Sequence, residues 1–163
     1  MVAPLATFLA AARWAREVST EVLLNPAPFC PLPDEVWKLV DYMTPNQHEL
    51  AKLARHTDVE AGAKLLQQRG PTAVVVTRGG DGSTVVTSAG ATDYPAAQAE
   101  AVDTTGAGDA FNAGLAVALA EGKSLEQAVR FGAEVGAYAV TRSGVLDGLP
   151  KLADLPSPEQ RST

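Results

Sequence analysis

The chain has 163 residues, of which 46% are hydrophobic and 20% charged, and its formal net charge is −6. This size and apolar content suit one folded unit with one sizeable core. No apolar run approaches the roughly 20 residues of a membrane-spanning helix. No block of Lys or Arg provides the positive surface of a nucleic-acid-binding protein. We therefore expect a cytoplasmic protein whose partners are small molecules, with no nucleic acid and no membrane among them.

The first part of the chain alternates between helical and extended patterns. Apolar residues recur at helical spacing after Pro4, and Asn25 and Pro26 end a short apolar run. Asp34 is placed to cap the next helix. The patterns predict a helix over 4–18, a strand over 21–24, a short helix from Asp34 and an extended stretch over 41–44.

The middle of the chain continues this alternation. We expect a helix from about Asn46 and another that Asp58 caps and that ends at Gln68. The β-branched run 73–77 is typical of a buried parallel strand, and 83–87 suits a hairpin partner. The alternation indicates an α/β layered fold. It leaves the strand at 21–24 at or near an open edge of the sheet, which is a liability unless it is covered.

Two long helices follow from about Thr105, with Gly122 between them. Ser124 caps the second helix, and Gln127 completes a capping box with it. We expect residues 1–150 to form the folded part. Residues 151–163, rich in Pro, Ser and charge, are expected to be a loosely ordered tail.

The strongest chemical signal is the pair of glycines Gly106 and Gly108, which flank Ala107 directly before an apolar helix. Glycines allow a tight turn that exposes consecutive N–H groups at the positive end of the helix, and such a turn binds anions. Asp109 lies on the first turn of the helix and could accept a proton from an attacking hydroxyl. Considered alone, the same residues are explained at least as well by a plain glycine turn and a helix-capping acid.

Two common phosphate-binding motifs are absent from the sequence. There is no G-x-x-x-x-G-K-[ST] segment, and Phe111 stands where the dinucleotide fingerprint needs its third glycine. The second absence disfavours an NAD-dependent oxidoreductase.

Taken whole, residues 103–114 match every fixed position of D-T-x-G-A-G-D-x-F-x-x-G. The segment resembles the signature of the ribokinase family, also called the PfkB carbohydrate kinases. The resemblance continues through 25–28, 44–49, 77–82 and 139–144, and it is closest to ribokinases proper. It covers about Pro4 to Pro150. It implies a ribokinase-like three-layer α/β/α fold that is partial, corresponding to the C-terminal half of the family fold.

The resemblance also implies roles for individual residues. Asp109 matches the catalytic base, and Gly106, Ala107 and Gly108 match the anion hole, with Gly108 also contacting ATP. Asn46 and Glu49 match a pair that helps to place Mg²⁺ and the phosphates. The implied ATP loop consists of Thr77, Arg78, Gly79, Gly80, Asp81 and Gly82. The implied K⁺ site consists of Asp103, Thr105 and the backbone carbonyls of Ala139, Arg142 and Gly144.

Some of these matches are weak when taken alone, and others depart from the family. A solvated helix start also explains Asn46 and Glu49, and a hairpin turn also explains 77–82. Gly148 stands in place of the family's Ser ligand to the cation, and Ala133 in place of the His beside adenine.

The implied activity is ATP-dependent phosphorylation of a sugar hydroxyl, foremost ribose to ribose 5-phosphate, with ATP, Mg²⁺ and K⁺. The family's first half carries a G-G-K-G-A-N-like sugar-binding motif and a β lid, and neither occurs in this sequence. Val2 stands near the place of a sugar-contacting Glu. The alternative is therefore a truncated or non-catalytic nucleotide-binding module. The expected partners are ATP, a small sugar, and either further copies in a homo-oligomer or a missing N-terminal half.

Overall fold

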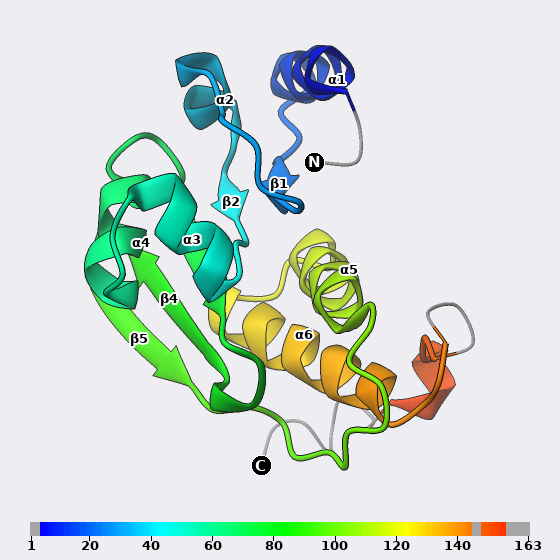
Figure 1. Ribbon diagram of the computed structural model, residues 1–163. Helices are drawn as coiled ribbons and strands as arrows, with labels where there is room; N and C mark the ends of the chain where they lie inside the picture. Colours follow the sequence, from blue (N-terminus) through cyan, green and yellow to red (C-terminus); the bar gives the residue numbers. More distant parts are fainter. Residues whose placement is uncertain (1–3, 145–147, 156–163) are drawn as a thin grey trace. The chain divides into compact units, whose positions relative to one another are not determined.

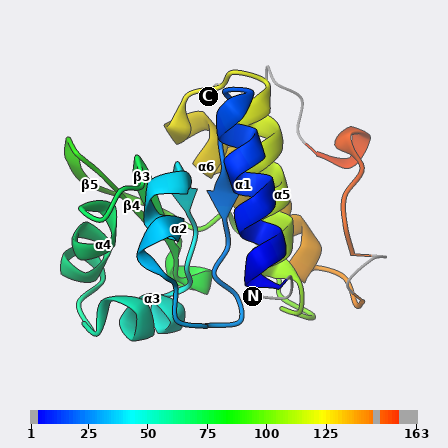
Figure 2. The same ribbon diagram turned by 90° about the horizontal axis from the view of Figure 1, so that it is seen from above.

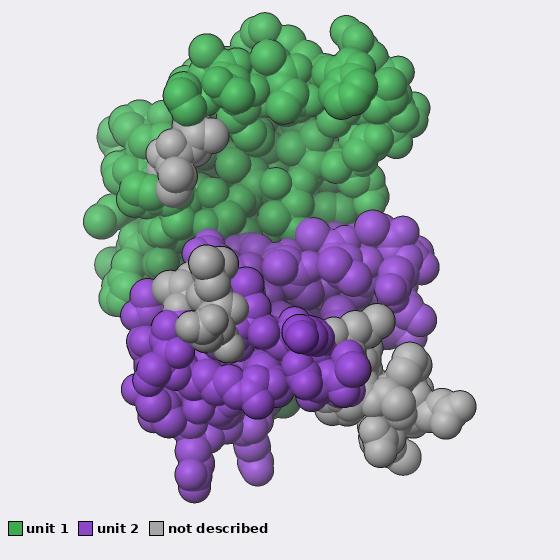
Figure 3. Space-filling view, turned by 90° about the vertical axis from the view of Figure 1, so that its right-hand side faces the viewer, with its two compact units in different colours: residues 1–95 green, residues 96–163 purple. Residues whose placement is uncertain are grey.

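The computed structural model describes residues 4–144 and 148–155, and the chain divides into two compact units, residues 1–95 and 96–163 (Figure 3). Of the expected tail, Leu152–Asp154 forms the short 3-10 helix η2, and 156–163 lies outside the described residues. Val2 also lies outside them. No helix within the described ranges is long and apolar enough to cross a membrane.

The first unit is built on a five-stranded sheet in the order β1-β2-β3-β4-β5 (Figure 1). β1, β2 and β3 are parallel, whereas β4 and β5 follow β3 as antiparallel neighbours. The expected α/β class is confirmed, and β1 lies at an edge of the sheet as expected. The strands are β1 (Leu23–Leu24), β2 (Tyr42–Met43), β3 (Ala73–Thr77), β4 (Ser83–Thr87) and β5 (Gly90–Tyr94).

Four helices of this unit share one apolar core with the sheet: α1 (Leu5–Glu17), α2 (Asp34–Leu39), α3 (Gln47–Ala54) and α4 (Val59–Gln67). α3 packs on β3, and α4 packs on both β3 and β4 (Figure 2). Trp37, Met43 and Val74 are among the fully buried side chains of this core. The core therefore fixes β2 and β3, whose carboxyl ends lead into the predicted site segments 46–49 and 77–82.

Local capping decides where these helices begin. Asn46 caps α3, and Asp58 caps α4 by accepting the Ala61 N–H at 2.8 Å, as predicted. The prediction that Asp34 caps α2 is wrong, because Pro33 occupies the cap position and Asp34 is the first helical residue. The Asp34 carboxylate instead pairs with Arg69 at 2.8 Å.

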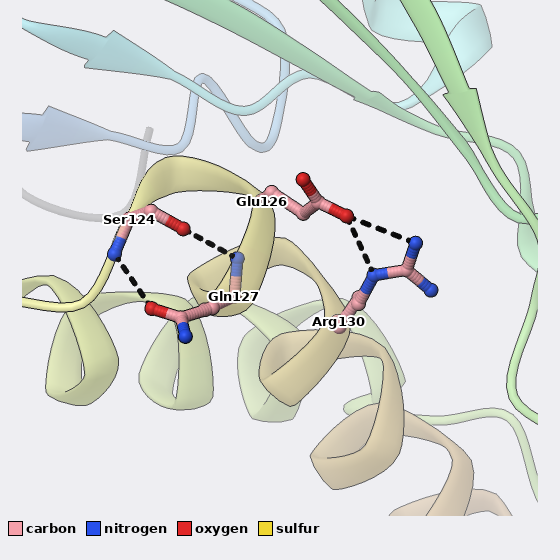
Figure 4. Close-up of polar contacts among 4 residues, drawn as sticks. All are labelled: Ser124, Glu126, Gln127 and Arg130. Carbon is pink, nitrogen blue, oxygen red and sulfur yellow. Dashed lines mark hydrogen bonds and ion pairs between the residues drawn. The ribbon is translucent and has the colours of Figure 1, made fainter. Parts of the chain in front are cut away.

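The second unit contains the two predicted long helices, α5 (Ala107–Ala120) and α6 (Leu125–Val140). The capping box at the start of α6 is confirmed: Gln127 N–H donates to Ser124 Oγ at 3.3 Å, and Ser124 N–H donates to Gln127 Oε1 at 3.0 Å (Figure 4). In the same first turn, Glu126 forms an exposed ion pair at 3.0 Å with Arg130, which lies one turn further along the helix. The start of α6 is thus defined by its own side chains.

α5 and α6 cross so closely that main chain meets main chain. A Cβ at Gly132 would lie 2.8 Å from the Phe111 carbonyl oxygen, and one at Gly136 would lie 3.2 Å from the Ala107 carbonyl oxygen. Only glycine allows such an approach without displacing the neighbouring helix. The first two turns of α5 are consequently held against the second half of α6.

We predict that Gly132→Ala lowers the free energy of unfolding by about 1–3 kcal/mol, because the added methyl group meets a carbonyl that cannot move aside. Gly108→Ala is the matched control, since a Cβ there has no atom within 4 Å. The control is expected to leave stability unchanged or to raise it by up to about 1 kcal/mol. Denaturant unfolding measures both. Similar losses for the two variants would contradict the close crossing.

Candidate active site

The start of α5 presents unused main-chain donors. Gly106 caps the helix in a left-handed conformation, with φ +80°, which glycine adopts without strain. The Ala107 N–H donates to the Thr104 carbonyl at 3.3 Å and completes the turn. Within the described ranges, the N–H groups of Gly108 and Asp109 make no hydrogen bond. Two free donors therefore lie at the positive end of a helix dipole, which favours an anion.

The surroundings of these donors are open. Gly108 is exposed, has no positive φ, and would bring an added Cβ near no other atom. The fold itself does not need a glycine there, although alanine would be the better helix former. Asp109 is exposed on the same first turn, and its carboxylate has no partner among the residues that the structure describes. Free amides and a free carboxylate thus lie next to each other.

Asp103 fastens the loop that leads into α5. Its carboxylate accepts the Thr105 N–H at 2.9 Å and the Gly144 N–H at 3.4 Å. The pKa of Asp103 is lowered from its usual value, mainly by the hydrogen bonds from Thr105 and further by the one from Gly144. The Val140 carbonyl accepts the N–H of Asp103 at 3.1 Å. The loop before α5 is therefore tied to the end of α6.

Three carbonyl oxygens of the predicted cation site come together at this end of α6. A Cβ at Gly148 would lie 3.3 Å from the oxygen of Ala139, 3.8 Å from that of Arg142 and 2.6 Å from that of Gly144. The Arg142 guanidinium lies over the Tyr138 ring, 4.1 Å from its centre. The oxygens that the family resemblance assigned to a cation thus all lie within 4 Å of one point next to Gly148, and the Cβ of a serine there would force the Gly144 oxygen to shift.

Asn46 and Glu49, in the first unit, form a capping box. Asn46 Oδ1 accepts the N–H groups of His48 and Glu49, both at 2.9 Å, and Glu49 Oε2 accepts the Asn46 N–H at 2.9 Å. Glu49 is only 8% exposed, so this is not a solvated helix start. The hydrogen bonds of the capping box do not use the Asn46 Nδ2 and Glu49 Oε1 atoms. Elsewhere, no three His, Cys, Asp or Glu side chains group together as a metal site within 4–144 and 148–155.

The predicted ATP loop lies next to this capping box. Asn46 and Thr77 form a parallel bridge, and the Thr77 N–H donates to the Pro45 carbonyl at 3.1 Å. The loop then folds on itself, with the Arg78 N–H donating to the Gly82 carbonyl at 2.8 Å around the short 3-10 helix η1 (Gly79–Asp81). Residues 79–81 are exposed. The structure therefore brings the two predicted phosphate-contacting segments of the first unit together.

One residue of this region was missed from the sequence. Asp93, on β5, accepts the Thr84 hydroxyl at 2.6 Å and pairs with the Arg78 guanidinium at 3.2 Å. It thereby holds the side chain of Arg78 against the hairpin. The turn residue Gly90 followed by Thr92 and Tyr94 was the available signal for a further hairpin strand.

Comparison with known proteins identifies the family. The family model for pfkB carbohydrate kinases matches residues 2–152. The chain belongs to this family. The ribokinase of Lactococcus lactis is 36% identical over 154 residues, which cover 93% of this chain and 49% of that protein. The ribokinase of Bacillus subtilis is 40% identical over 131 residues, 79% of this chain and 43% of that protein.

Solved structures of the pfkB family agree with this assignment. The ribokinase of Thermotoga maritima matches with a TM-score of 0.85 at 35% identity, over 93% of this chain and 52% of that one. The Arabidopsis thaliana ribokinase, in complex with ribose and ATP, matches with a TM-score of 0.84 at 29% identity, over 91% and 50%. The fold is thus ribokinase-like, and the chain spans about half the length of the relatives it matches.

The lowered pKa of Asp103 predicts a pH dependence of stability. A carboxyl with a depressed folded-state pKa stabilises the fold above its unfolded-state value, 3.8, and loses that contribution as the pH falls below it. Asp103→Asn should therefore melt at a lower temperature than wild type at neutral pH, with a gap that shrinks below pH 3.8. Thermal melts across the acid range measure this. A gap independent of pH would argue against the hydrogen-bonded carboxylate.

Proposed function

We propose that this chain supplies the ATP site and the catalytic base of a carbohydrate kinase that transfers the γ-phosphoryl group of ATP to a sugar hydroxyl. Ribose, giving ribose 5-phosphate, is the proposed sugar, since the similar proteins named above are ribokinases. The observation that carries the proposal is the pair of free N–H groups at Gly108 and Asp109 beside the free Asp109 carboxylate.

The chemistry follows from this pair. Phosphoryl transfer places negative charge on the oxygens of the moving group, and preorganised amides at a helix start stabilise that charge, each by about 3 kcal/mol when well placed. The Asp109 carboxylate accepts the proton of the attacking hydroxyl as the new P–O bond forms. Gly106 and Ala107 supply the turn that directs the amides, and Gly108 keeps the approach open.

The remaining contacts to ATP are proposed for the first unit. Thr77, the exposed residues 79–81 and the half-buried Gly82 contact the nucleotide, with Arg78 held beside them by Asp93. Asn46 Nδ2, outside the capping box, donates to a phosphate oxygen. These groups orient the nucleotide without taking part in the proton transfer.

Two cations fit the residues present. Glu49 Oε1 is a single carboxylate oxygen outside the capping box, which suits Mg²⁺ held mainly by water and phosphate oxygens. The carbonyls of Ala139, Arg142 and Gly144 converge on one point, and Asp103 and Thr105 are tied to the same turn, which suits K⁺. Mg²⁺ would supply positive charge to the phosphates, and K⁺ would hold the carbonyl turns in place.

A second candidate is a nucleotide-binding module without sugar kinase activity. It is favoured by one observation, that the chain spans about half the length of its relatives. Without groups that orient the sugar, loss of positioning alone removes several kcal/mol of catalysis, on the order of 7 or more in well-oriented systems. In the first candidate those groups come from an N-terminal half of the family fold.

We also propose that the β1 edge is covered in the working protein, by that N-terminal half or by a further copy in a homo-oligomer. β1 is the first strand in the order of the described sheet, and the outer side of an edge strand is a template for another strand. The proposed use of ATP and a small sugar also leads us to propose a cytoplasmic location.

Titration of the chain with MgATP tests the ATP site. Wild type is expected to bind, and Gly108→Ala to bind at least about tenfold more weakly, because a methyl group stands before the amides. Unfolding stability serves as the control, since the substitution is spatially free. Static light scattering of the same sample gives the number of copies. No binding by wild type would contradict both candidates.

A coupled assay of ADP release with D-ribose then separates the candidates. Turnover supports the kinase, and binding without turnover supports the module. Where turnover occurs, Asp109→Asn should lower kcat at least about 100-fold and leave ATP affinity nearly unchanged, because only the proton acceptor is lost. An equal loss of ATP binding would make Asp109 a structural residue.

A further inference from the structure

Asn112, in the middle of α5, makes an unusual bond to its own helix. Its Nδ2 donates to the Gly108 carbonyl oxygen at 2.8 Å, one turn earlier. Because a carbonyl accepts only from a donor, the amide nitrogen and not the oxygen must face Gly108. The Oδ1 atom of the same side chain is buried and has no partner among the described residues.

Local stability does not explain this residue. Asparagine is a poor helix former, and a buried acceptor without a hydrogen bond lowers stability further. Its neighbours Ala110 and Ala113 show that α5 uses alanine freely. The side chain of Asn112 instead acts on Gly108, the residue whose carbonyl it contacts.

The Gly108 carbonyl and the Asp109 N–H belong to one peptide unit. The carbonyl accepts Asn112 Nδ2 in addition to the main-chain bond that an α-helix places on it. The N–H at the other side of the same unit is one of the two free donors at the helix start. Hydrogen bonds accepted by a carbonyl polarise its peptide, so that the N–H becomes a stronger donor.

We propose that Asn112 is a positioning residue for the anion-binding turn. Its side-chain amide fixes and polarises the Gly108–Asp109 peptide, and the Asp109 N–H thereby binds a phosphate oxygen of the nucleotide more tightly. Asn112 does not itself touch the nucleotide. The inference rests on the proposed function of the α5 start as the phosphate site.

Two variants separate this role from a purely structural one. Asn112→Leu has similar size and no donor, and leucine is the better helix former, so the helix is retained. Asn112→Ser keeps a donor, because a serine hydroxyl in a helix can bond to the carbonyl one turn earlier. Each full chain is measured for its melting temperature, the ¹³C′ chemical shift of Gly108 without ligand, and its affinity for MgATP.

We expect Asn112→Leu to move the Gly108 ¹³C′ signal upfield and to weaken MgATP binding about tenfold, the effect of weakening one hydrogen bond. Asn112→Ser should keep the signal near its wild-type position and stay within about threefold in affinity. All three proteins should remain folded at the temperature of the titration.

The proposal is overturned if Asn112→Leu binds MgATP as wild type does, or if its Gly108 signal does not move. Equal weakening in Asn112→Ser and Asn112→Leu would likewise overturn it, because the retained donor would then have no effect. If wild type fails to bind MgATP, the proposed function fails and the phosphate role of Asn112 with it. A Gly108 signal that still responds to Asn112→Leu would identify that failure as one of the ATP site and not of the peptide contact.

Discussion

The close contact of α5 with α6 is the constraint on which the candidate site depends. At Gly132 the absent side chain lets α6 reach the Phe111 carbonyl, and at Gly136 it lets α6 reach the Ala107 carbonyl. Main chain packed against main chain has little freedom to shift, because no flexible side chain lies between to absorb the movement. The first turn of α5 is thus rigid before any ligand arrives, and rigid donors need no reorganisation to stabilise charge.

In the first unit, hydrogen bonds between strand ends hold the predicted site segments in place. Its parallel strands end at one edge of the sheet, where ligands of α/β proteins commonly bind. Asn25 Nδ2 donates to the Thr44 carbonyl at 2.7 Å, which ties the end of β1 to the end of β2. Asn46 then bridges to Thr77 at the end of β3. Three successive strand ends are therefore linked by hydrogen bonds.

Features set by neighbouring residues in the chain could be predicted from the sequence. Asp58 and Ser124 cap their helices as predicted, because a cap depends on residues only two or three positions away. The Asp34 cap was wrong because the helix begins one residue earlier than the capping pattern required, so that Pro33 is the cap and Asp34 the first helical residue. β5 was missed because four of its five residues are exposed, so no alternation of apolar and polar residues marks it.

The candidate site was predictable as a set of residues but not as an arrangement. The glycine pattern at 106–108 indicated free amides correctly, since the helix start follows directly in sequence. The convergence of carbonyls next to Gly148 depends on how the chain turns after α6, which no local pattern encodes. The same holds for Asn112, whose effect on Gly108 requires knowing which way its amide points.

The proposed use of peptide N–H groups as the anion-binding donors has a consequence for how such a site responds to its environment. Lysine, arginine and histidine carry protons that acids, bases or acylating agents can remove or block, whereas a peptide N–H neither titrates in water nor reacts with such reagents. Anion binding by the N–H groups of Gly108 and Asp109, as proposed, should therefore persist across solution conditions and chemical treatments that disable phosphate sites built from basic side chains.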